Sequence, residues 1–413
     1  MTYKTITDCR ACGSGELIPL FSIGEQYVND FVDQENVLAG HVCPIELVLC
    51  PRCSLVQAKH TAPQDFMYTR HYWYRSGVTR TMRDALRDVA EQAGRLIGLR
   101  EGDVVLDIGS NDGTLLRCYP DDAFKVGVEP ASNMVEEGSQ GVDCFIGDFW
   151  SHDVLVEHLG REFPGAKVIT ALGMFYDLED PNRFIGDVAK ALHPEGIFVA
   201  QLMCLRNMVD SMDVGNLSHE HLEFYSLRSL RFLYDRHGLE IVDVERNEVN
   251  GGSYRIFARL KGSSVEPFPG AERRVELAEV QDEGLDDPVF FRRWFSMVEE
   301  NKRRVVEFIK DAVADGIRVW VYGASTKGNV LLQYYGLDRT IIGGASERSP
   351  EKWGKFTIGT GIPIFSEDHA RKVAPDYFLV LPYAFVDEFV ERESAWRDKG
   401  GRFIVPLPHL KIV

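Results

Sequence analysis

Four of the eight cysteines form two CxxC pairs, Cys9/Cys12 and Cys50/Cys53. Two residues between the cysteines let both thiolates of one turn bind the same ion, and two such turns complete a tetrahedral zinc site. A site with four sulfur ligands has no open coordination position, so we predict that its zinc is structural and not catalytic. The alternative is a set of reduced, buried thiols, which leaves the repeated spacing to chance.

A second candidate site is the turn from Asp107 to Gly113, which follows the apolar run at Val104 and opens a helical pattern. Gly109 and Gly113 permit a tight turn and the close approach of a ligand to the backbone. Glu129 ends the next apolar run about 20 residues later, where an acidic side chain can bond ribose hydroxyls. This arrangement predicts a site for a nucleoside-containing cofactor.

The charges in this turn favour one cofactor over another. Asp107 and Asp112 would repel a pyrophosphate but suit a cationic sulfonium ligand, and Asn111 stands where the dinucleotide pattern has its middle glycine. Asp148, followed by Phe149, ends a third apolar run, where it can meet an adenine amine. We therefore predict S-adenosylmethionine (SAM) as the cofactor. A nicotinamide-dependent dehydrogenase and an acidic turn without a ligand are the alternatives.

Two histidines flank a carboxylate in His219-Glu220-His221, which follows the fifth predicted strand. In α/β proteins, catalytic loops lie at the carboxyl ends of the strands. A carboxylate beside a histidine can fix its charge and its tautomer, so we predict a role in proton transfer. Metal binding by the two histidines and structural hydrogen bonding are the alternatives.

Three aromatic residues precede a cation in Tyr72-Trp73-Tyr74-Arg75. Such a cluster is either ordinary core packing or a pocket in which a tyrosine hydroxyl acts on a substrate. The residues alone leave both interpretations open.

These residues have to be held by alternating strands and helices. Apolar runs begin at Val104, Lys125, Cys144, Val168 and Gly196, and the spans between them have helical spacing. This pattern predicts βαβ units in a mainly parallel sheet. An amphipathic helix is expected before it, over residues 78–97, and an antiparallel hairpin after it, over residues 239–260.

The remaining third of the chain repeats the α/β pattern. A charged segment, residues 271–315, is predicted to form a pair of helices. Strands are expected at 317–323, 340–343 and 377–381. We predict an α/β protein with three domains: a zinc-binding module (residues 1–75), a class I SAM methyltransferase domain (76–262) and a second Rossmann-like domain (263–413).

Composition excludes several classes of protein. With 45% hydrophobic and 26% charged residues, the 413-residue chain has a globular composition, and its net charge of −17 argues against nucleic acid or an anionic membrane as the partner. No apolar run approaches the roughly 20 residues that span a bilayer, and the N-terminus lacks the apolar core of a signal peptide. We expect a cytoplasmic protein, a monomer or a weak homodimer, in which disulfides are disfavoured.

The order of these features resembles the sugar C-methyltransferases of bacterial deoxysugar pathways, over essentially the whole chain. The motifs that carry the resemblance are the CxxC pair at 9–12, Cys50 to Gln57, Tyr72 to Gly77, the turn 107–113, Glu220-His221, Asn250 to Arg255, and Tyr322 to Asn329. The resemblance implies a zinc-binding domain, a methyltransferase domain and a C-terminal Rossmann-like domain. It also implies methylation of C3 of a 4-keto-6-deoxyhexose linked to a nucleoside diphosphate, either GDP or dTDP.

The resemblance also implies roles for individual residues. His221 would remove the C3 proton, with Glu220 and His219 beside it, and Tyr74 would bond the sugar or the developing oxyanion. The turn from Gly323 to Asn329 would receive the diphosphate, helped by Lys327 and Arg255, and a purely structural βα turn is the alternative. The full set of implied substrate contacts is Tyr72, Arg75, Ser76, Tyr176, Ser218, Tyr225, Asn250, Arg255, Gly323, Ser325, Thr326, Lys327, Asn329, Glu347 and Tyr383.

The chain departs from the family pattern in the expected sugar pocket. Ser218 replaces a tyrosine, Tyr176 replaces a histidine, and Tyr383-Ala384 replaces an Asn-His pair. These changes leave the sugar and the residues that assist His221 open. An O- or N-methyltransferase acting on a nucleotide sugar is one alternative, and a zinc-containing protein that binds a nucleotide sugar without chemistry is another.

Overall fold

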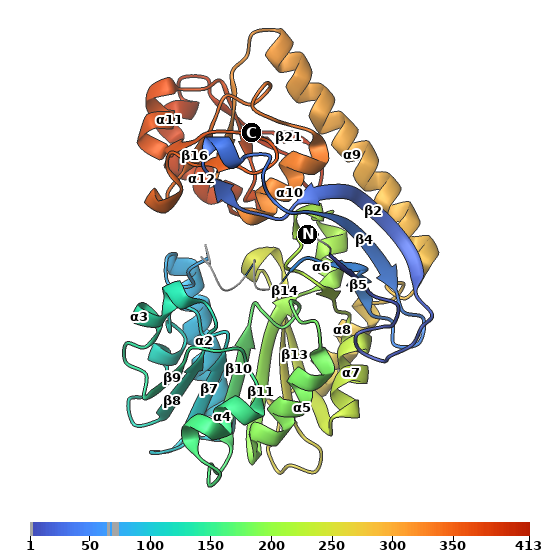
Figure 1. Cartoon of the computed structure of the whole chain (residues 1–413), viewed down its shortest axis with the longest axis vertical. Helices are drawn as coiled ribbons and strands as arrows, with labels where there is room; N and C mark the ends of the chain where they lie inside the picture. Colours follow the sequence, from blue (N-terminus) through green and yellow to red (C-terminus); the bar gives the residue numbers. More distant parts are fainter. Residues whose placement is uncertain (1–2, 64–66, 68–73) are drawn as a thin grey trace.

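A computed structural model covers the chain, and it describes residues 3–63, 67 and 74–413. Figure 1 shows two α/β lobes, with the N-terminal strands lying beside the boundary between them. The predicted fold class, a zinc-binding module followed by two α/β units, is confirmed. Tyr72 belongs to the predicted site but lies outside the described residues.

The N-terminal module is made of short antiparallel strands. They are β1 (Lys4–Thr5), β2 (Ile18–Tyr27), β3 (Phe31–Val32), β4 (Val42–Leu49), β5 (Val56–Ala58) and β6 (His60–Thr61). Strands β2, β4 and β5 form a four-stranded sheet together with β12 (Glu223–Phe224), which comes from the methyltransferase region and pairs with β5. Strand β3 pairs with β17 (Phe356–Thr357) of the C-terminal region. The module is therefore joined by backbone hydrogen bonds to both lobes.

The lower lobe of Figure 1 is built on a seven-stranded sheet of order β13-β14-β11-β10-β7-β8-β9. Its strands are β7 (Val104–Ile108), β8 (Phe124–Val128), β9 (Cys144–Ile146), β10 (Ala166–Leu172), β11 (Leu192–Met203), β13 (Leu239–Asn247) and β14 (Ser253–Leu260). Strands β7 to β11 are parallel, and β13 and β14 form the antiparallel hairpin. The predicted strands and hairpin are confirmed.

Helices cover both faces of this sheet. They are α2 (Arg80–Ile97), α3 (Val135–Gly138), α4 (His152–Leu159), α5 (Pro181–Ala191), α6 (Leu205–Asp210) and α7 (Leu227–Arg236). Side chains of successive strand residues point to opposite faces. Accordingly, Val105 packs with α2 residues, whereas Leu106 packs with residues of α4, α5 and α7. Both faces are buried, which explains why the strands are almost continuously apolar.

The upper lobe has a six-stranded sheet of order β18-β16-β15-β19-β20-β21. Its strands are β15 (Val319–Tyr322), β16 (Ala345–Glu347), β18 (Ile364–Ser366), β19 (Tyr377–Val380), β20 (Arg402–Val405) and β21 (Lys411–Ile412). Its helices are α10 (Thr326–Tyr335), α11 (Glu367–Val373), α12 (Val386–Arg392) and α13 (Ser394–Arg397). Apart from β21, the strands are parallel. From β15 the chain first adds β16 and β18 on one side and then β19 and β20 on the other, so the strand order reverses at β15, as in doubly wound nucleotide-binding folds.

The predicted strand at 340–343 is wrong. Residues 339–341 form a turn in which the amides of Ile341 and Ile342 donate to the Asp338 carbonyl. The strand β16 starts two residues after this segment, at Ala345. Ile342 is fully buried, so its apolar character reflects packing and not strand pairing.

Two helices link the lobes, as the charged segment predicts. They are α8 (Ala271–Gln281) and the long α9 (Pro288–Ala314), which Figure 1 shows along the edge of the upper lobe. Asp287 caps α9 and Pro288 starts it, a favourable first position because proline has no amide hydrogen to lose. Its buried residues, from Phe291 to Ile309, pack against β2 and the C-terminal sheet.

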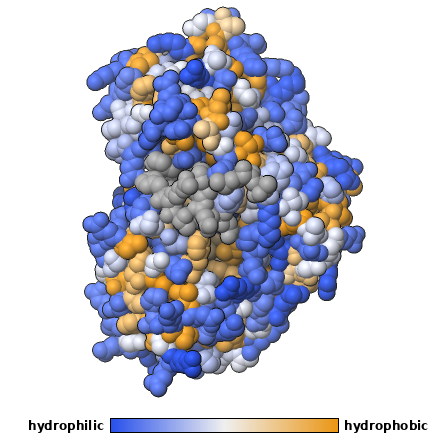
Figure 2. Space-filling model, in the orientation of Figure 1, coloured by the Kyte–Doolittle hydropathy of each residue, from blue (hydrophilic) through white to orange (hydrophobic). Residues whose placement is uncertain are grey.

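On the face shown in Figure 2, hydrophobic residues occur in small groups among hydrophilic ones. Within the described ranges, we find no helix that combines the length and the apolar character needed to cross a membrane.

Candidate functional site

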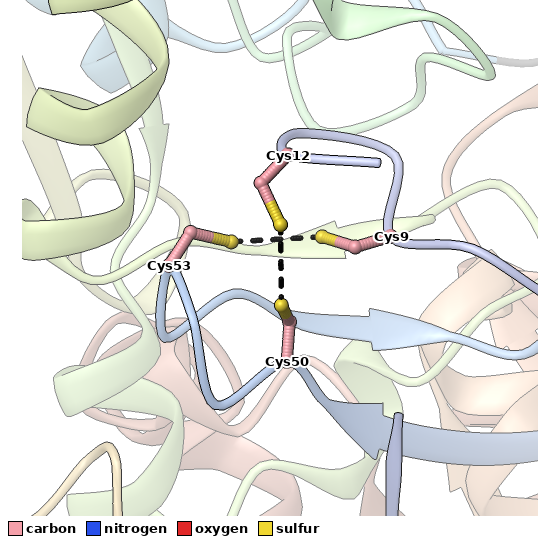
Figure 3. A group of neighbouring side chains, drawn as sticks. All are labelled: Cys9, Cys12, Cys50 and Cys53. Atoms are coloured by element: carbon pink, nitrogen blue, oxygen red, sulfur yellow. Dashed lines mark hydrogen bonds between the residues drawn. The ribbon is translucent and has the colours of Figure 1, made fainter. Parts of the chain in front are cut away.

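The four predicted zinc ligands come together between two turns. The sulfur atoms lie within 4.8 Å of one another, with Cys9 Sγ 3.5 Å from Cys53 Sγ and Cys12 Sγ 3.4 Å from Cys50 Sγ. Figure 3 shows all four side chains pointing toward one centre. Sulfur atoms bound to one tetrahedral zinc ion are about 3.8 Å apart, as expected from Zn–S bonds of about 2.3 Å. The four buried sulfurs thus fit a zinc ion.

Arg10, between the first two cysteines, connects this cluster to the lower lobe. Its side chain is 2% exposed, and its guanidinium donates to the Ala58 carbonyl and the Thr61 hydroxyl. Nε lies 3.7 Å from Glu223 Oε1, and Nη2 lies 3.3 Å from Glu179 Oε1. The zinc cluster thus holds a buried cation against two acids of the methyltransferase region.

The predicted cofactor turn lies at the carboxyl end of β7. Gly109 has φ +72°, and a Cβ there would lie 2.8 Å from Met174 Cγ, so only glycine fits. Asn111 accepts from the Ser76 amide and donates to the Tyr74 carbonyl, at 3.0 and 3.1 Å. The sequence therefore folds the 74–77 segment onto the turn through one side chain.

A cavity of about 640 Å³ opens next to this turn. From the predicted cofactor set it is lined by Gly109, Asn111, Glu129, Asp148 and Phe149, and from the predicted catalytic and substrate sets by Tyr74, Ser76, Tyr176, Glu220, His221, Thr326 and Lys327. The structure therefore brings the two predicted sites into one cavity between the lobes.

The cofactor end of the cavity fits SAM. Glu129 accepts the amides of Asn111 and Ala131, which fixes its carboxylate at the end of β8 with capacity for ribose hydroxyls. Trp150 Nε1 is buried and lacks a hydrogen-bond partner among the described residues, so it is a donor that a ligand can satisfy. Burial raises the pKa of Glu129.

His221 is held as a neutral base. Its Nδ1 lies 2.7 Å from the Asn216 carbonyl, which only accepts, so Nδ1 carries the hydrogen and Nε2 keeps its lone pair. Burial, and then the charge of Lys327, lower the pKa of His221 to about 3. The ring packs edge-on against Tyr176, with 4.7 Å between centroids.

Glu220, the adjacent residue, has the opposite shift. Burial raises the pKa of its carboxyl from 4.5 to about 7. Asp177 shares this environment: it lines the cavity, its Oδ1 has no hydrogen-bond partner among the described residues, and burial raises its pKa well above 3.8. Burial therefore raises the pKa of two acids of the cavity wall, beside a neutral histidine.

The loop that carries Glu220 and His221 is attached to the zinc-binding module on both sides. His219 Nε2 lies 2.8 Å from the Cys43 carbonyl in β4, and the Ala58 amide donates to the Leu222 carbonyl at 2.8 Å. Strand β12 then pairs with β5 directly after the loop. We call residues 218–222 the catalytic loop, after the proton-transfer role that the sequence predicts for Glu220 and His221. His219 lies outside the cavity lining, and its ring connects the loop to β4 instead of facing a substrate.

Other predicted contacts also lie outside the cavity lining. They are Asp107, Asp112, Gly113, Arg75, Ser218, Tyr225, Arg255, Gly323, Ser325, Asn329, Glu347 and Tyr383. Asp107 accepts from Thr170 Oγ1, and Asp112 accepts the amides of Gly77 and Thr114, so both stabilise the cofactor turn. Gly113, at φ +73°, lies against the Gly138 carbonyl. The side chain of Asn250 is outside the part that the structure describes.

Arg255 does not reach the predicted diphosphate site. Its side chain is 2% exposed and donates to Gln201 at 3.0 Å, Asp88 at 2.6 Å and Glu245 at 3.3 Å. Tyr225 is fully buried and stacks on Phe175. Ser218 is buried, with no hydrogen-bond partner for its hydroxyl among the described residues. These side chains belong to the interior.

Arg75 instead pairs with Glu137 at 3.0 Å and Glu351 at 3.6 Å, which links the two lobes.

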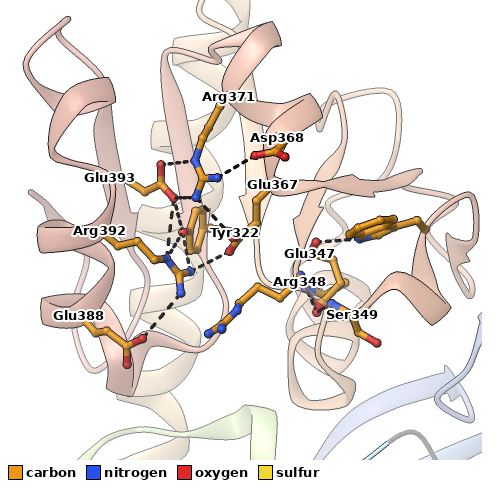
Figure 4. A network of polar contacts seen from close by, with 12 residues as sticks. Tyr322, Glu347, Arg348, Ser349, Glu367, Asp368, Arg371, Glu388, Arg392 and Glu393 are labelled. Carbon is orange, nitrogen blue, oxygen red and sulfur yellow. Dashed lines mark hydrogen bonds and ion pairs between the residues drawn. The ribbon is translucent and has the colours of Figure 1, made fainter. Parts of the chain in front are cut away.

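The predicted diphosphate turn is partly occupied by the protein itself. Glu347 accepts the amides of Ala324, Arg348 and Ser349, and the Ser325 hydroxyl caps α10 by accepting from Gly328. Gly323 packs on Pro382, Asn329 donates to the Asp30 carbonyl, and Tyr383 packs in the hydrophobic core. Figure 4 shows a separate network around Tyr322, whose hydroxyl donates to Glu393 and accepts from Arg392. Only Thr326 and Lys327 of the described upper-lobe residues line the cavity.

Sequence reasoning missed Asp177, Trp150 and Arg10. Asp177 and Trp150 directly follow predicted residues, so position after a strand end was a usable signal for both. Arg10 lies inside a CxxC pair, where nothing in the spacing indicates contact with Glu223.

Three family models match successive parts of the chain. A "Putative zinc binding domain" matches residues 9–68, a "Methyltransferase domain" residues 74–244, and a "C-methyltransferase C-terminal domain" residues 248–408. The chain belongs to the SAM-dependent C-methyltransferase family. SAM and zinc are the cofactors of this enzyme.

The C-methyltransferase is similar to a relative named C-methyltransferase NovU, from Streptomyces niveus. The two are 29% identical over 414 residues, which span 99% of this chain and 97% of the relative. A SAM-dependent methyltransferase from Clostridium acetobutylicum is 13% identical, with a TM-score of 0.34 over 44% of this chain and 92% of that one. The CcbJ methyltransferase from Streptomyces caelestis is 15% identical, with a TM-score of 0.33 over 43% of this chain and 88% of that one.

Proposed function

We propose that the enzyme adds a methyl group to C3 of a 4-keto-6-deoxyhexose linked to GDP or dTDP. One observation carries this proposal: a single cavity extends from Glu129 and Asp148 to Glu220, His221 and Lys327. A cofactor at the first end and an acceptor at the second would share one enclosed space.

The chemistry needs a base beside an acidic carbon. A C4 ketone acidifies the C3 hydrogen, and the neutral His221 Nε2 is the proposed acceptor of that proton. Glu220 would orient the His221 ring or balance the positive charge that the ring gains with the proton. Tyr74 would donate a hydrogen bond to the acceptor sugar. When bound, SAM supplies an electrophilic methyl group. Exclusion of water from the cavity would protect the reactive enolate and strengthen the electrostatic contacts to it.

The nucleotide part of the acceptor would lie against the upper lobe, near Thr326 and Lys327. Sugar nucleotides are anions, so the backbone amides at the start of α10 favour their binding in a protein of net charge −17. The predicted cytoplasmic location agrees with such a substrate.

Product analysis tests the proposal. The zinc-containing enzyme is incubated with SAM carrying a ¹³C methyl group and with a panel of GDP- and dTDP-linked 4-keto-6-deoxysugars, and products are examined by mass spectrometry and NMR. We expect one labelled methyl group bonded to C3 of one or more acceptors.

A methyl group on oxygen or nitrogen would replace the proposal with an O- or N-methyltransferase. No labelled product with any acceptor, from enzyme that binds S-adenosylhomocysteine, would refute the substrate class. Cys118→Ser is a suitable activity control, because this cysteine is partly exposed and lies outside the zinc cluster and the cavity lining.

A further inference from the structure

The lysine of the upper lobe that lines the cavity lies close to the catalytic histidine. Lys327 is the second residue of α10, and it lines the cavity together with Glu220 and His221. Both side chains therefore face one space, and the charge of Lys327 helps to lower the pKa of His221.

One short turn contacts both residues. It is the 3-10 helix η4 (Val214–Asn216). A Cβ added to Gly215 would lie 3.1 Å from the Lys327 carbonyl oxygen and 3.5 Å from Lys327 Cβ, so α10 packs directly on the turn. The next residue, Asn216, accepts the hydrogen of His221 Nδ1. The turn thereby fixes the lysine relative to the histidine across the boundary between the lobes.

Asp213 stabilises this arrangement. Its carboxylate accepts the Gly215 amide at 3.1 Å and Asn216 Nδ2 at 2.6 Å, which keeps η4 in shape. Burial lowers the pKa of Lys327, and the charge of Asp213 opposes that shift. The acid therefore favours the charged form of the lysine.

Most of the other charged residues that line the cavity are acidic, so an enolate formed there would need a cation beside it. The acidic residues of the described lining are Glu129, Asp148, Asp177, Glu179, Asp180 and Glu220. Its lysines and arginines are Arg183 and Lys327, and Arg183 lies 3.9 Å from Asp187 of its own helix. Negative charge that develops among acidic groups is unfavourable unless a positive group lies beside it.

We propose that Lys327 is a catalytic residue whose ammonium group contacts the ketone oxygen of the acceptor and stabilises its negative charge. This rests on the proposed function, because it requires a ketone next to the methylated carbon. The C3–H bond breaks, and its electron pair forms a C3–C4 double bond. The π pair of the ketone moves to oxygen, and the proton moves to His221 Nε2. No oxidation occurs, and the new oxyanion lies between two positive groups.

Contact with the diphosphate is the competing role, and two measurements separate the roles. The first is the rate at which solvent deuterium replaces the C3 hydrogen of dTDP-4-keto-6-deoxyglucose or GDP-4-keto-6-deoxymannose, with S-adenosylhomocysteine bound. The second is the dissociation constant of dTDP or GDP alone. For Lys327→Met we expect the saturated exchange rate to fall by about 100-fold, the effect of losing one oxyanion contact, with nucleotide affinity changed by less than about 3-fold.

Lys327→Arg provides a conservative variant and should recover part of the exchange, because it keeps the positive charge. If Lys327→Met is unstable, the same two measurements on Lys327→Arg, with exchange reduced and nucleotide affinity unchanged, still decide the role. Lys355→Met is the matched control, a lysine of the same lobe that bonds Asp33 outside the cavity, and it should behave as wild type.

Exchange within about 3-fold of wild type in Lys327→Met would overturn the proposal. A loss of nucleotide affinity that accounts for the loss of exchange would assign Lys327 to the diphosphate instead. If the wild-type enzyme exchanges neither ketosugar and methylates neither, the proposed function itself fails, and the role of Lys327 fails with it.

Discussion

The zinc-binding module and the C-terminal lobe both contact the methyltransferase lobe, but they contribute to its cavity in different ways. No described residue before Tyr74 lines the cavity, although the module bonds the catalytic loop on both sides through Cys43, Ala58 and β5. Among the described residues of the C-terminal lobe, two line the cavity, Thr326 and Lys327.

The two parts of the chain therefore have different roles. The zinc module positions the loop that carries Glu220 and His221, and the C-terminal lobe closes the cavity with groups that can touch the acceptor. A change in the module should therefore act through stability and loop geometry. A change at the cavity face of the C-terminal lobe should act on chemistry with the fold intact.

Loss of zinc should have the largest effect. Structural zinc sites contribute apparent binding free energies of about 10–16 kcal/mol, and here the energy also holds the turns that carry Arg10. We expect Cys50→Ser to lose zinc and to lower methyl transfer by more than about 100-fold, measured as zinc content and turnover. Normal turnover in a zinc-free protein would contradict the positioning role of the module.

Breaking the buried ion pair between the module and the lower lobe should come next. Arg10→Met leaves Glu223, whose side chain is fully buried, without its cation. Removal of one partner of a buried pair typically costs about 3–5 kcal/mol, and we expect a loss of that size in urea unfolding. The double variant Arg10→Met/Glu223→Gln should recover part of it. A single variant within about 1 kcal/mol of wild type would show that the pair does not join the two parts.

The pH dependence of stability tests whether Glu220 is buried away from water in the catalytic loop. Burial raises the folded-state pKa of Glu220 from 4.5 to about 7, so its contribution is favourable below pH 4.5 and is lost as the pH rises through 7. Glu220→Gln removes this dependence. Relative to wild type, the variant should therefore gain about 2 kcal/mol of unfolding free energy between pH 5 and pH 8. A constant difference across that range would mean that Glu220 is not desolvated.

A helix cap in the C-terminal lobe should have the smallest effect. Ser325→Ala removes the hydroxyl that accepts from Gly328 at the start of α10. The expected cost is about 1 kcal/mol of unfolding free energy. Turnover should stay within about 3-fold, because η4 still packs against Lys327. A large loss of turnover with little loss of stability would give the cap a direct catalytic role.

Short-range patterns in the sequence predict the sites that depend on local spacing. The CxxC pairs, Gly109, Glu129 and Asp148 each follow from residue type at a strand end or in a turn, and the structure brings each into its expected neighbourhood. To predict these features, it is enough to know where one strand or turn ends and which residues follow it.

Residues whose role depends on long-range contacts could not be placed in this way. Tyr254 and Arg255 are adjacent in β14 and point to opposite faces, so one bonds Asp282 of the segment after α8 and the other Asp88 of α2. His219 and His221 are two residues apart, yet one bonds β4 and the other faces the cavity. Which partner each side chain meets is set by how the three parts of the chain pack together.

Solvent-deuterium exchange in the His221→Asn variant is the most direct test of His221 as the base that removes the C3 proton. The C3 hydrogen of the accepted nucleotide ketosugar is followed by NMR in D₂O, with S-adenosylhomocysteine bound. Wild-type enzyme should exchange this hydrogen, and His221→Asn should exchange it at least about 100-fold more slowly while it binds S-adenosylhomocysteine normally. Exchange at the wild-type rate in the folded variant would contradict a catalytic loop in which His221 removes the proton.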